Sequence, residues 1–458
     1  MTATSDLPVP TSSPDLPPVE RYAALPAGFK AGGLAAGIKA SGRPDLAVIV
    51  TTAGPAAAAA VFTPNSFAAA PVRLSRAHLA ATSGDARGGF GWAEAVISTS
   101  GSANAATGPA GDADQLEIAR LLADATGVAL DRTLHLSTGV IGTRLPLDRV
   151  ASGLASLIPT LESHDAGLQA AALALCTTDS VTKVATTKVT LPGADGLVAT
   201  VTVSGIAKGV GMIHPRMATM LSVILTDAAV APETLWSLLR PAAARTWNQL
   251  SVDGDTSTND TVFVLASGAA GTRPVEPGSP AAAALGAGIE AVARDLARQQ
   301  AADGEGASTL ITAAVSGALD DAEARAVART VVSSSLVKAA AHGRDPNWGR
   351  IAGAAGNARL AEAAVLEAAG MAPAEAAARG GTPAVLDPAR LRISIARHLV
   401  FDGPLGGPLP FDRSAARAAM DAPEEVIALD LGLGTGSGEA FGCDLTETYV
   451  IENSEYTT

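Results

Sequence analysis

The middle of this 458-residue chain reads Gly205-Ile-Ala-Lys-Gly-Val-Gly-Met-Ile-His-Pro-Arg-Met-Ala-Thr-Met-Leu-Ser-Val-Ile-Leu-Thr-Asp227. Gly209, Gly211 and Pro215 interrupt regular structure in its first half, because glycine opens backbone conformations that other residues avoid and proline removes a hydrogen-bond donor. Residues 219–226 then form an apolar run typical of a buried strand. The segment therefore predicts an irregular loop that leads into a strand, with Thr219 where the strand starts.

Strand and helix patterns mix on both sides of this segment, without a repeat period or a coiled-coil heptad. Strand patterns cover 46–51, 60–72, 95–98, 261–266, 309–314 and 391–395, and a hairpin covers 181–203. Helical patterns cover 112–126, 147–157, 232–249, 280–300 and 320–341. A short loop is expected at 136–142. Such a mixture predicts a layered α/β or α+β protein.

The composition excludes several classes of protein. Lys and Arg total 32 and Asp and Glu total 45, so the formal charge is −13, which argues against a general nucleic-acid binder. The longest uncharged stretch, 51–72, contains prolines and is mostly alanine, so it falls short of a membrane span. No secretory signal pattern is present, and we expect a cytoplasmic protein. Since aromatic residues are only 3%, small aliphatic side chains must build the core.

The N-terminal residues 1–27 carry six prolines among Ser, Thr and Asp, which predicts a flexible tail, with order beginning near Phe29. The cysteines Cys176 and Cys443 are expected to be small buried hydrophobes, and no Cys/His spacing suits a structural zinc site. We therefore expect no resident metal.

Three local motifs have simpler interpretations than catalysis. Residues 432–438 are glycine-rich but lack the lysine of a phosphate-binding loop, which favours a tight turn between strands. The stretch Asp253-Gly-Asp-Thr-Ser-Thr-Asn-Asp260 lacks the terminal glutamate of a calcium loop. Its polar side chains are expected to cap a tight loop, with a substrate-shaping role as the second interpretation. His214 is expected to be a solvated loop histidine.

The segment Lys208-Gly-Val-Gly-Met-Ile-His-Pro-Arg-Met-Ala-Thr-Met-Leu221 resembles the self-cleavage segment of the ornithine acetyltransferase family, also called glutamate N-acetyltransferases or bifunctional arginine-biosynthesis proteins. Blocks similar to the family run in order through nearly everything after residue 28. They are Gly28-Phe-Lys30, Ser41–Asp45, Leu136–Gly142, Thr177–Asp179, Ser251–Asp260, Gly304–Ala307, Gly343–Arg350 and Gly442–Thr446.

The resemblance implies an α+β fold built as a layered αββα sandwich of the N-terminal-nucleophile type, with a smaller α/β C-terminal domain. It also implies that the precursor cuts itself between Ala218 and Thr219. The tail and residues 28–218 would then form an α chain, and residues 219–458 would form a β chain that begins with Thr219.

The roles implied by the resemblance fit the chemistry of acetyl transfer. Thr219 would be the nucleophile, and its hydroxyl needs a base, which the new α-amino group supplies at a reference pKa of about 7.7–8.0. Thr138 and Gly139 would stabilise the oxyanion. The residues that would contact substrate are Thr177, Lys208, Thr219, Glu305, Asn453 and Thr458. Lys208 suits a substrate carboxylate and Glu305 suits a substrate ammonium.

The implied reaction moves the acetyl group of N2-acetyl-L-ornithine to L-glutamate through an acetyl-threonine intermediate. Acetyl-CoA is a possible further co-substrate, and no other cofactor is expected. The resemblance implies a heterotetramer of two α and two β chains, without a nucleic-acid or membrane partner. Two alternatives remain: a monofunctional member of the family in a specialised pathway, and an amidase or aminopeptidase with the same nucleophile.

Overall fold

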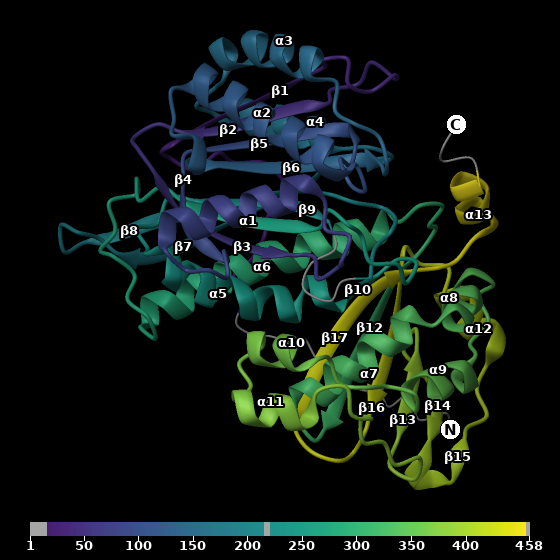
Figure 1. The fold of residues 1–458 in the computed structure, drawn as a ribbon. Coiled ribbons are helices and arrows are strands. Elements are labelled where there is room, and N and C mark those ends of the chain that lie inside the picture. Colours follow the sequence, from purple (N-terminus) through teal and green to yellow (C-terminus); the bar gives the residue numbers. More distant parts are fainter. Residues whose placement is uncertain (1–15, 215–219, 455–458) are drawn as a thin grey trace.

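A computed structural model describes residues 16–214 and 220–454 (Figure 1). Ala218, Thr219 and Thr458 therefore lie outside the described residues. A six-stranded sheet forms the centre of the molecule, in the order β4-β3-β11-β9-β8-β7. Its strands are β3 (Ala56–Phe62), β4 (Phe90–Ala93), β7 (Lys183–Pro192), β8 (Val198–Lys208), β9 (Leu221–Thr226) and β11 (Thr261–Ala266).

The two strands of this sheet that follow the predicted cleavage site, β11 and β9, lie between strands that precede it. Strand β11 lies between β3, to which it is antiparallel, and β9, to which it is parallel. Strand β9 in turn pairs with β8, antiparallel and in register from Val203 opposite Thr226 to Lys208 opposite Leu221. The strands that precede and follow the predicted cleavage site in sequence, β8 and β9, therefore pair in one sheet and do not belong to two separate folded bodies.

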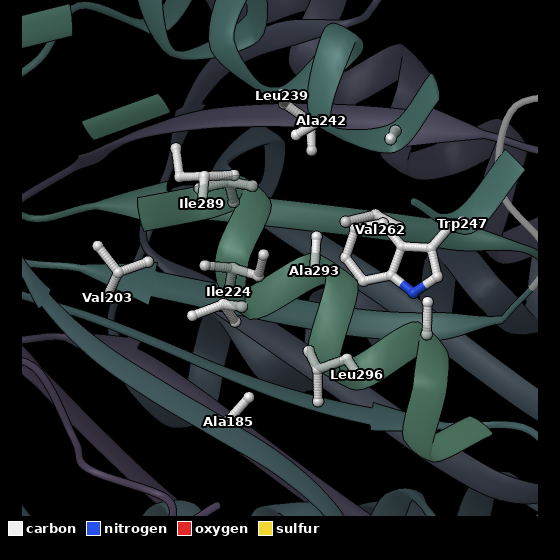
Figure 2. Close-up of a cluster of buried hydrophobic side chains, with 14 of the residues drawn as sticks. Ala185, Val203, Ile224, Leu239, Ala242, Trp247, Val262, Ile289, Ala293 and Leu296 are labelled. Atoms are coloured by element: carbon white, nitrogen blue, oxygen red, sulfur yellow. The ribbon is translucent and has the colours of Figure 1, made fainter. Parts of the chain in front are cut away.

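The six-stranded sheet is buried on both faces. In β3, Ala56, Ala58 and Ala60 join one apolar cluster while Ala57 and Ala59 join another, as expected for a strand whose side chains alternate. Helices α5 (Pro232–Arg245) and α6 (Pro280–Ala302) cover the second face. Figure 2 shows this side of the core, where leucine, isoleucine and alanine side chains of α5 and α6 meet strand residues beside the Trp247 indole.

The facing apolar surface of the six-stranded sheet packs toward a four-stranded sheet of order β1-β2-β5-β6. Its strands are β1 (Phe29–Leu34), β2 (Leu46–Thr51), β5 (Ala95–Ser102) and β6 (Thr133–Val140). Helices α1 (Ala70–Ser83) and α4 (Asp165–Leu175) contribute to the cluster between the sheets. Helices α2 (Gly108–Thr126) and α3 (Leu147–Leu157) cover the outer face. The predicted layered α+β fold is confirmed, with α1 and α4 lying between the two sheets.

The C-terminal part adds a seven-stranded sheet of order β10-β17-β12-β16-β13-β14-β15, which Figure 1 shows below the other two. Its strands are β10 (Leu250–Ser251), β12 (Leu310–Ala318), β13 (Arg392–Ile395), β14 (His398–Asp402), β15 (Gly407–Pro408), β16 (Glu424–Asp430) and β17 (Gly436–Cys443). The helices of this part are α7 (Asp321–Ser333), α8 (Ser335–His342), α9 (Trp348–Ala355), α10 (Ala363–Ala368), α11 (Pro373–Arg379), α12 (Arg413–Ala419) and α13 (Glu447–Ser454). Short 3-10 helices occur at Leu130–Arg132, Ile158–Thr160, Trp247–Gln249 and Gly403–Leu405.

Helix α6 joins the C-terminal sheet to the central layers. Arg298 forms an ion pair of 2.8 Å with Glu424 of β16, and Arg294 forms one with Glu439 of β17. Phe441 of β17 belongs to the same apolar cluster as α6. Among the described helices of the chain, none has the length and apolar composition that crossing a membrane requires.

Several local predictions need correction. The strand expected at 60–72 ends at Phe62, and α1 begins at Ala70. The loop expected at 136–142 is largely strand, since β6 continues to Val140 in parallel pairing with β5. The helix expected at 320–341 is two helices, because the Ser334 side chain caps α8 by accepting a hydrogen bond from the Val337 backbone N–H.

Residues 16–27 also differ from the flexible tail expected for 1–27. Glu20 and Thr186 exchange two backbone hydrogen bonds of 2.8 Å at the outer edge of β7. Because an edge strand has free backbone donors and acceptors, it provides a pairing partner for this segment. The expectation of a loose tail is wrong for these residues, whereas residues 1–15 lie outside the described part of the chain.

We predict that Trp247→Ala lowers the free energy of unfolding by about 3–5 kcal/mol, because it leaves a large cavity in a core of small side chains. The Trp247 side chain is fully buried and its Nε1 donates a hydrogen bond of 3.0 Å to Gln300 Oε1. Chemical denaturation followed by circular dichroism measures the change. The control is Trp92→Ala, since Trp92 of β4 is 40% exposed and its loss should cost much less.

Candidate functional site

A cavity of about 290 Å³ opens where β6 and β8 end and β9 begins. Six residues for which the sequence predicted a role line it: Thr138, Gly139, Thr177, Lys208, Glu305 and Asn453. Met220, the residue after Thr219, also lines it. The structure therefore brings together all the predicted site residues that lie within its described part, from elements far apart in the sequence.

Thr138 and Gly139 reach the cavity through an irregularity in the four-stranded sheet. The parallel register between β5 and β6 shifts at Gly101 and Ser102, as in a β-bulge, which re-aims the backbone. Gly139 has a φ of +130°, and a Cβ atom on it would lie 2.3 Å from the Gly101 carbonyl carbon. Only glycine fits there, so the close approach of two strands presents the Thr138–Gly139 backbone to the cavity.

Lys208 forms the positive side of the cavity. Its Nζ donates a hydrogen bond of 3.1 Å to Thr138 Oγ1, and its carbonyl accepts one of 2.8 Å from Gln300 Nε2. Gln300 is held by the Trp247 indole in the core. The next residues are fixed as well, because Ile213 N–H donates to Asp253 Oδ1 at 2.9 Å. The glycine-rich loop is thus tied to the core along its described length.

Glu305 forms the negative side. Its Oε2 accepts a hydrogen bond of 3.0 Å from Asn453 Nδ2, and its Oε1 accepts one of 3.3 Å from Thr178 Oγ1. The Glu305 backbone N–H donates to Val210 O at 2.8 Å. A Cβ on Gly211 would lie 2.2 Å from Glu305 Oε2, so glycine is needed for the carboxylate to lie against this loop.

Thr177 is held by a charged cluster that the sequence analysis did not identify. Its backbone N–H donates to Asp179 Oδ2 at 2.9 Å. Lys183 Nζ lies 2.6 Å from Asp179 Oδ1 and 2.5 Å from Asp303 Oδ2, and the Lys183 and Asp179 side chains are fully buried. Burial alone would raise the pKa of Asp179, but Lys208 and Lys183 hold it well below its usual value. The spacing of these residues carries no motif, so only the fold reveals the cluster.

The loop after β10 supplies one wall of the cavity. Asn259 Nδ2 donates to Ala103 O at 2.6 Å and to Ser137 O at 2.8 Å, which ties the central sheet to the four-stranded sheet beside Thr138. Asp253 caps its own loop, as the first interpretation of this stretch predicted, because its Oδ1 accepts a hydrogen bond of 3.1 Å from the Asp255 N–H. Its hydrogen bond with Ile213 of the glycine-rich loop was not predicted. The part of Asn259 in fixing the two sheets was not predicted, because its partners are backbone carbonyls distant in sequence.

Other sequence predictions have clear outcomes. Both cysteines are buried, and burial raises the pKa of Cys176 to about 11. His214 is half-buried and its Nδ1 lies 3.1 Å from Ser251 Oγ, so the expected solvated histidine is wrong. A turn between strands is present where 432–438 predicted one, but it is shorter: residues 431–435 connect β16 to β17, and 436–438 already belong to β17.

Comparison with known proteins identifies this chain as an acyltransferase of arginine biosynthesis. The chain belongs to the ArgJ family, which it matches over residues 30–458. The bifunctional arginine biosynthesis protein ArgJ of Synechococcus sp. is 45% identical over 427 residues, covering 91% of this chain and 93% of that protein. The protein of the same name from Thermus thermophilus is 42% identical over 420 residues, covering 91% and 95%.

Two solved structures are also similar. The arginine biosynthesis bifunctional protein ArgJ of Bacillus halodurans is 36% identical and covers 52% of this chain and 99% of its own, with a TM-score of 0.45. The ornithine acetyltransferase of Mycobacterium tuberculosis, solved in complex with ornithine, is 40% identical and covers 43% and 97%, with a TM-score of 0.38.

The resemblance assigns Gly139 to oxyanion stabilisation. On that expectation we predict that Gly139→Ala lowers acyl transfer by at least about 10²-fold, because the new Cβ displaces the backbone at this position. Steady-state kinetics measure the effect. Gly142→Ala is the matched control: Gly142 also has a positive φ, of +85°, but nothing lies within 4 Å of an added Cβ. It should cost about 1–2 kcal/mol of stability and leave activity nearly intact. Equal activities for the two variants would contradict the assignment.

We predict that Lys183→Met lowers the free energy of unfolding by about 3–5 kcal/mol, since it leaves buried carboxylates without their cation. Lys188→Met, on the same strand but exposed, should change stability by no more than about 0.5 kcal/mol. Chemical denaturation at neutral pH measures both. A small loss in Lys183→Met would mean that the cluster does not contribute to stability.

The same cluster of Asp179, Lys183 and Asp303 should make the free energy of unfolding depend on pH. Because the folded pKa of Asp179 lies below its unfolded value of about 3.9, its stabilisation is present above about pH 4 and is lost as the pH falls below that value. The parent protein should therefore lose more stability between pH 5 and pH 3 than Lys183→Met does. Thermal unfolding across this range tests the sign.

Proposed function

We propose that the chain transfers the acetyl group of N2-acetyl-L-ornithine to L-glutamate, through an acetyl ester on Thr219. The observation that carries the proposal is that a cation, Lys208, and an anion, Glu305, both line one small cavity. Thr138, Gly139 and Met220, the residue that follows Thr219, line the same cavity. The similar proteins support the proposal, since they are named bifunctional arginine biosynthesis proteins and an ornithine acetyltransferase.

The charges suit both substrates, which are small amino acids with a carboxylate. The Lys208 ammonium can bind a carboxylate through a charge-assisted hydrogen bond. Glu305, already hydrogen-bonded to Asn453, can accept hydrogen bonds from the amino group of ornithine. A volume of about 290 Å³ is at the lower end of the range for ligand pockets, which fits an amino acid. Thr177 and Thr458 are the further contacts that we propose.

The proposed reaction needs an activated hydroxyl and a place for negative charge. Self-cleavage between Ala218 and Thr219 would give Thr219 an amino group as its own base. The oxyanion would be stabilised by Thr138 and Gly139. Since Lys208 donates to Thr138 Oγ1, the hydroxyl hydrogen of Thr138 stays available for donation into the cavity.

The central sheet supports the idea that the two pieces stay together after such a cut. Residues 16–214 contribute β3 and β8, and residues 220–454 contribute β9 and β11. Strands β11 and β9 lie between β3 and β8, with backbone pairing on both sides. The α chain of 1–218 and the β chain of 219–458 would therefore remain one folded unit. From the resemblance we further propose a heterotetramer of two such units in the cytoplasm.

We also propose acetyl-CoA as a second acetyl donor, because the curated relatives carry the name bifunctional. A direct assay of glutamate acetylation with acetyl-CoA decides between a bifunctional enzyme and a monofunctional one.

We predict that intact-mass spectrometry of the purified protein finds two fragments that meet between Ala218 and Thr219, and that these co-elute in gel filtration. Thr219→Ala should remain one chain, because it lacks the attacking hydroxyl. Thr219→Ser is the matched control: it keeps a hydroxyl and should still be cut. A folded parent protein that stays as a single chain would overturn the proposed nucleophile.

The acceptor is tested on the same preparation. Acetylornithine should release ornithine only once per active site until glutamate is added, because the acetyl ester then waits for an amine. Continuous release of acetate without glutamate would show an amidase instead.

A further inference from the structure

The loop between β1 and β2, residues 35–45, contains the block Ser41–Asp45, which has no part in the mechanism proposed above. Asp45 is fully buried and organises this loop, because its Oδ2 accepts a hydrogen bond of 2.8 Å from the Lys39 N–H. Its backbone carbonyl accepts another of 2.8 Å from the Ser100 N–H of β5. The loop is therefore fixed to the end of the four-stranded sheet at which the cavity opens.

Two cations of this loop lie against one wall of the cavity. Arg43 Nη2 donates a hydrogen bond to the Thr177 carbonyl, and Lys39 Nζ donates one to the Cys176 carbonyl. Since Thr177 lines the cavity, the Arg43 guanidinium lies at the rim that this residue forms. In the part of the chain that the structure describes, neither cation has an ion-pair partner. Both charges are therefore available to an anion that enters from solvent.

The electrostatics of the loop also favour an anion at this place. Burial and the neighbouring Arg43 guanidinium lower the pKa of Lys39 to about 8, although Asp45 acts in the opposite direction. Lys208 lowers the same pKa further from the other side. Lys39 is still mostly protonated at neutral pH, so three positive charges repel one another beside the cavity. A carboxylate bound there would relieve that repulsion.

The two substrates of the proposed reaction carry opposite charges on their side chains. The side chain of N2-acetyl-L-ornithine ends in an ammonium, and that of L-glutamate ends in a carboxylate. Glu305, which accepts a hydrogen bond of 3.3 Å from Thr178 Oγ1, attracts the ammonium and repels the carboxylate. Arg43 contacts Thr177, the residue before Thr178. Two consecutive residues of one wall thus hold groups of opposite sign, as a cavity that accepts both substrates requires.

We propose that Arg43 binds the side-chain carboxylate of the acceptor glutamate. The proposal rests on the proposed function, because it assigns a residue to the second of the two substrates. A guanidinium has five N–H donors, and the Thr177 carbonyl engages one nitrogen, so the remaining donors can form charge-assisted hydrogen bonds with a carboxylate. Arg43 takes no part in the proton transfers. Its role is to select glutamate over an acceptor whose side chain is uncharged.

Support of the cavity wall is the other role that Arg43 could have, and kinetics separate the two. In a reaction with an acetyl-enzyme, kcat/KM for acetylornithine reports on the first step and kcat/KM for glutamate reports on the second. Loss of support at Thr177 changes both values, whereas loss of a contact with glutamate changes only the second. Glutamine is the probe of charge, since it has the shape of glutamate without the carboxylate. Acetyl-CoA is absent from these assays, so its phosphate groups do not contribute.

The test compares Arg43→Gln with the matched control Arg149→Gln. Arg149 of α3 is likewise exposed and likewise donates to a backbone carbonyl beside the cavity end of the sheet, that of Gly37 in the same loop. We predict that Arg43→Gln lowers kcat/KM for glutamate by about 10–100-fold, the loss expected for hydrogen bonds to a charged group. The values for acetylornithine and for glutamine as acceptor should stay within about twofold of the parent. Arg149→Gln should behave as the parent with all three.

Three results would overturn the proposal: equal losses with glutamate, glutamine and acetylornithine, an unchanged kcat/KM for glutamate, or a parent enzyme that uses glutamine as well as glutamate. If Arg43→Gln fails to fold, Arg43→Lys decides. A lysine keeps the charge but loses the planar pair of donors, so the preference for glutamate over glutamine should fall several-fold, and an unchanged preference contradicts the role. A parent protein that transfers no acetyl group from acetylornithine would overturn the proposed function itself, and that result is seen before any Arg43 variant is made.

Discussion

The pairing of β9 with strands on both of its sides is the constraint on which the rest of the molecule depends. Through β8 it is bound to the preceding part of the chain, and through β11 it is bound to β3, which lies far upstream. This double pairing fixes where Met220 enters the cavity. The glycine-rich loop ends on one side of the same point and the Asn259–Asp260 wall lies on the other, so the position of one strand sets the geometry of the site.

Charge compensation is arranged in two layers around the cavity. Lys208 and Glu305 face the space where a substrate binds in the proposed function, and their own partners are neutral groups such as Thr138 and Asn453. Behind them, the fully buried Lys183 ammonium forms ion pairs with Asp179 and with Asp303. The inner layer can thus hold the backbone of Thr177 rigidly, while the outer layer keeps charges that a ligand can satisfy.

More of the fold than of the candidate site could be predicted from the sequence. The apolar run at 261–266 and the helix at 147–157 have the bounds that their patterns predict, because each is a regular element buried on at least one face. The resemblance to a family supplied Lys208 and Glu305. It could not supply their surroundings, because the Lys183 cluster depends on contacts between distant segments that share no spacing. The loop expected at 136–142 is strand because its pairing with β5 outweighs the local signal of its glycines.

The N-terminal segment 16–27 covers an exposed edge of the central sheet, although its residue types do not predict this role. Strand β7 ends the six-stranded sheet, and its outer edge would otherwise offer unpaired amides to any other extended chain. Glu20 pairs with that edge, and Arg21 fastens the segment to Asp295 of α6. A shortened protein that begins near Phe29 would keep the whole cavity, but it would expose the unpaired backbone of an edge strand. Its defect would therefore be aggregation during storage, and its catalytic activity would be retained.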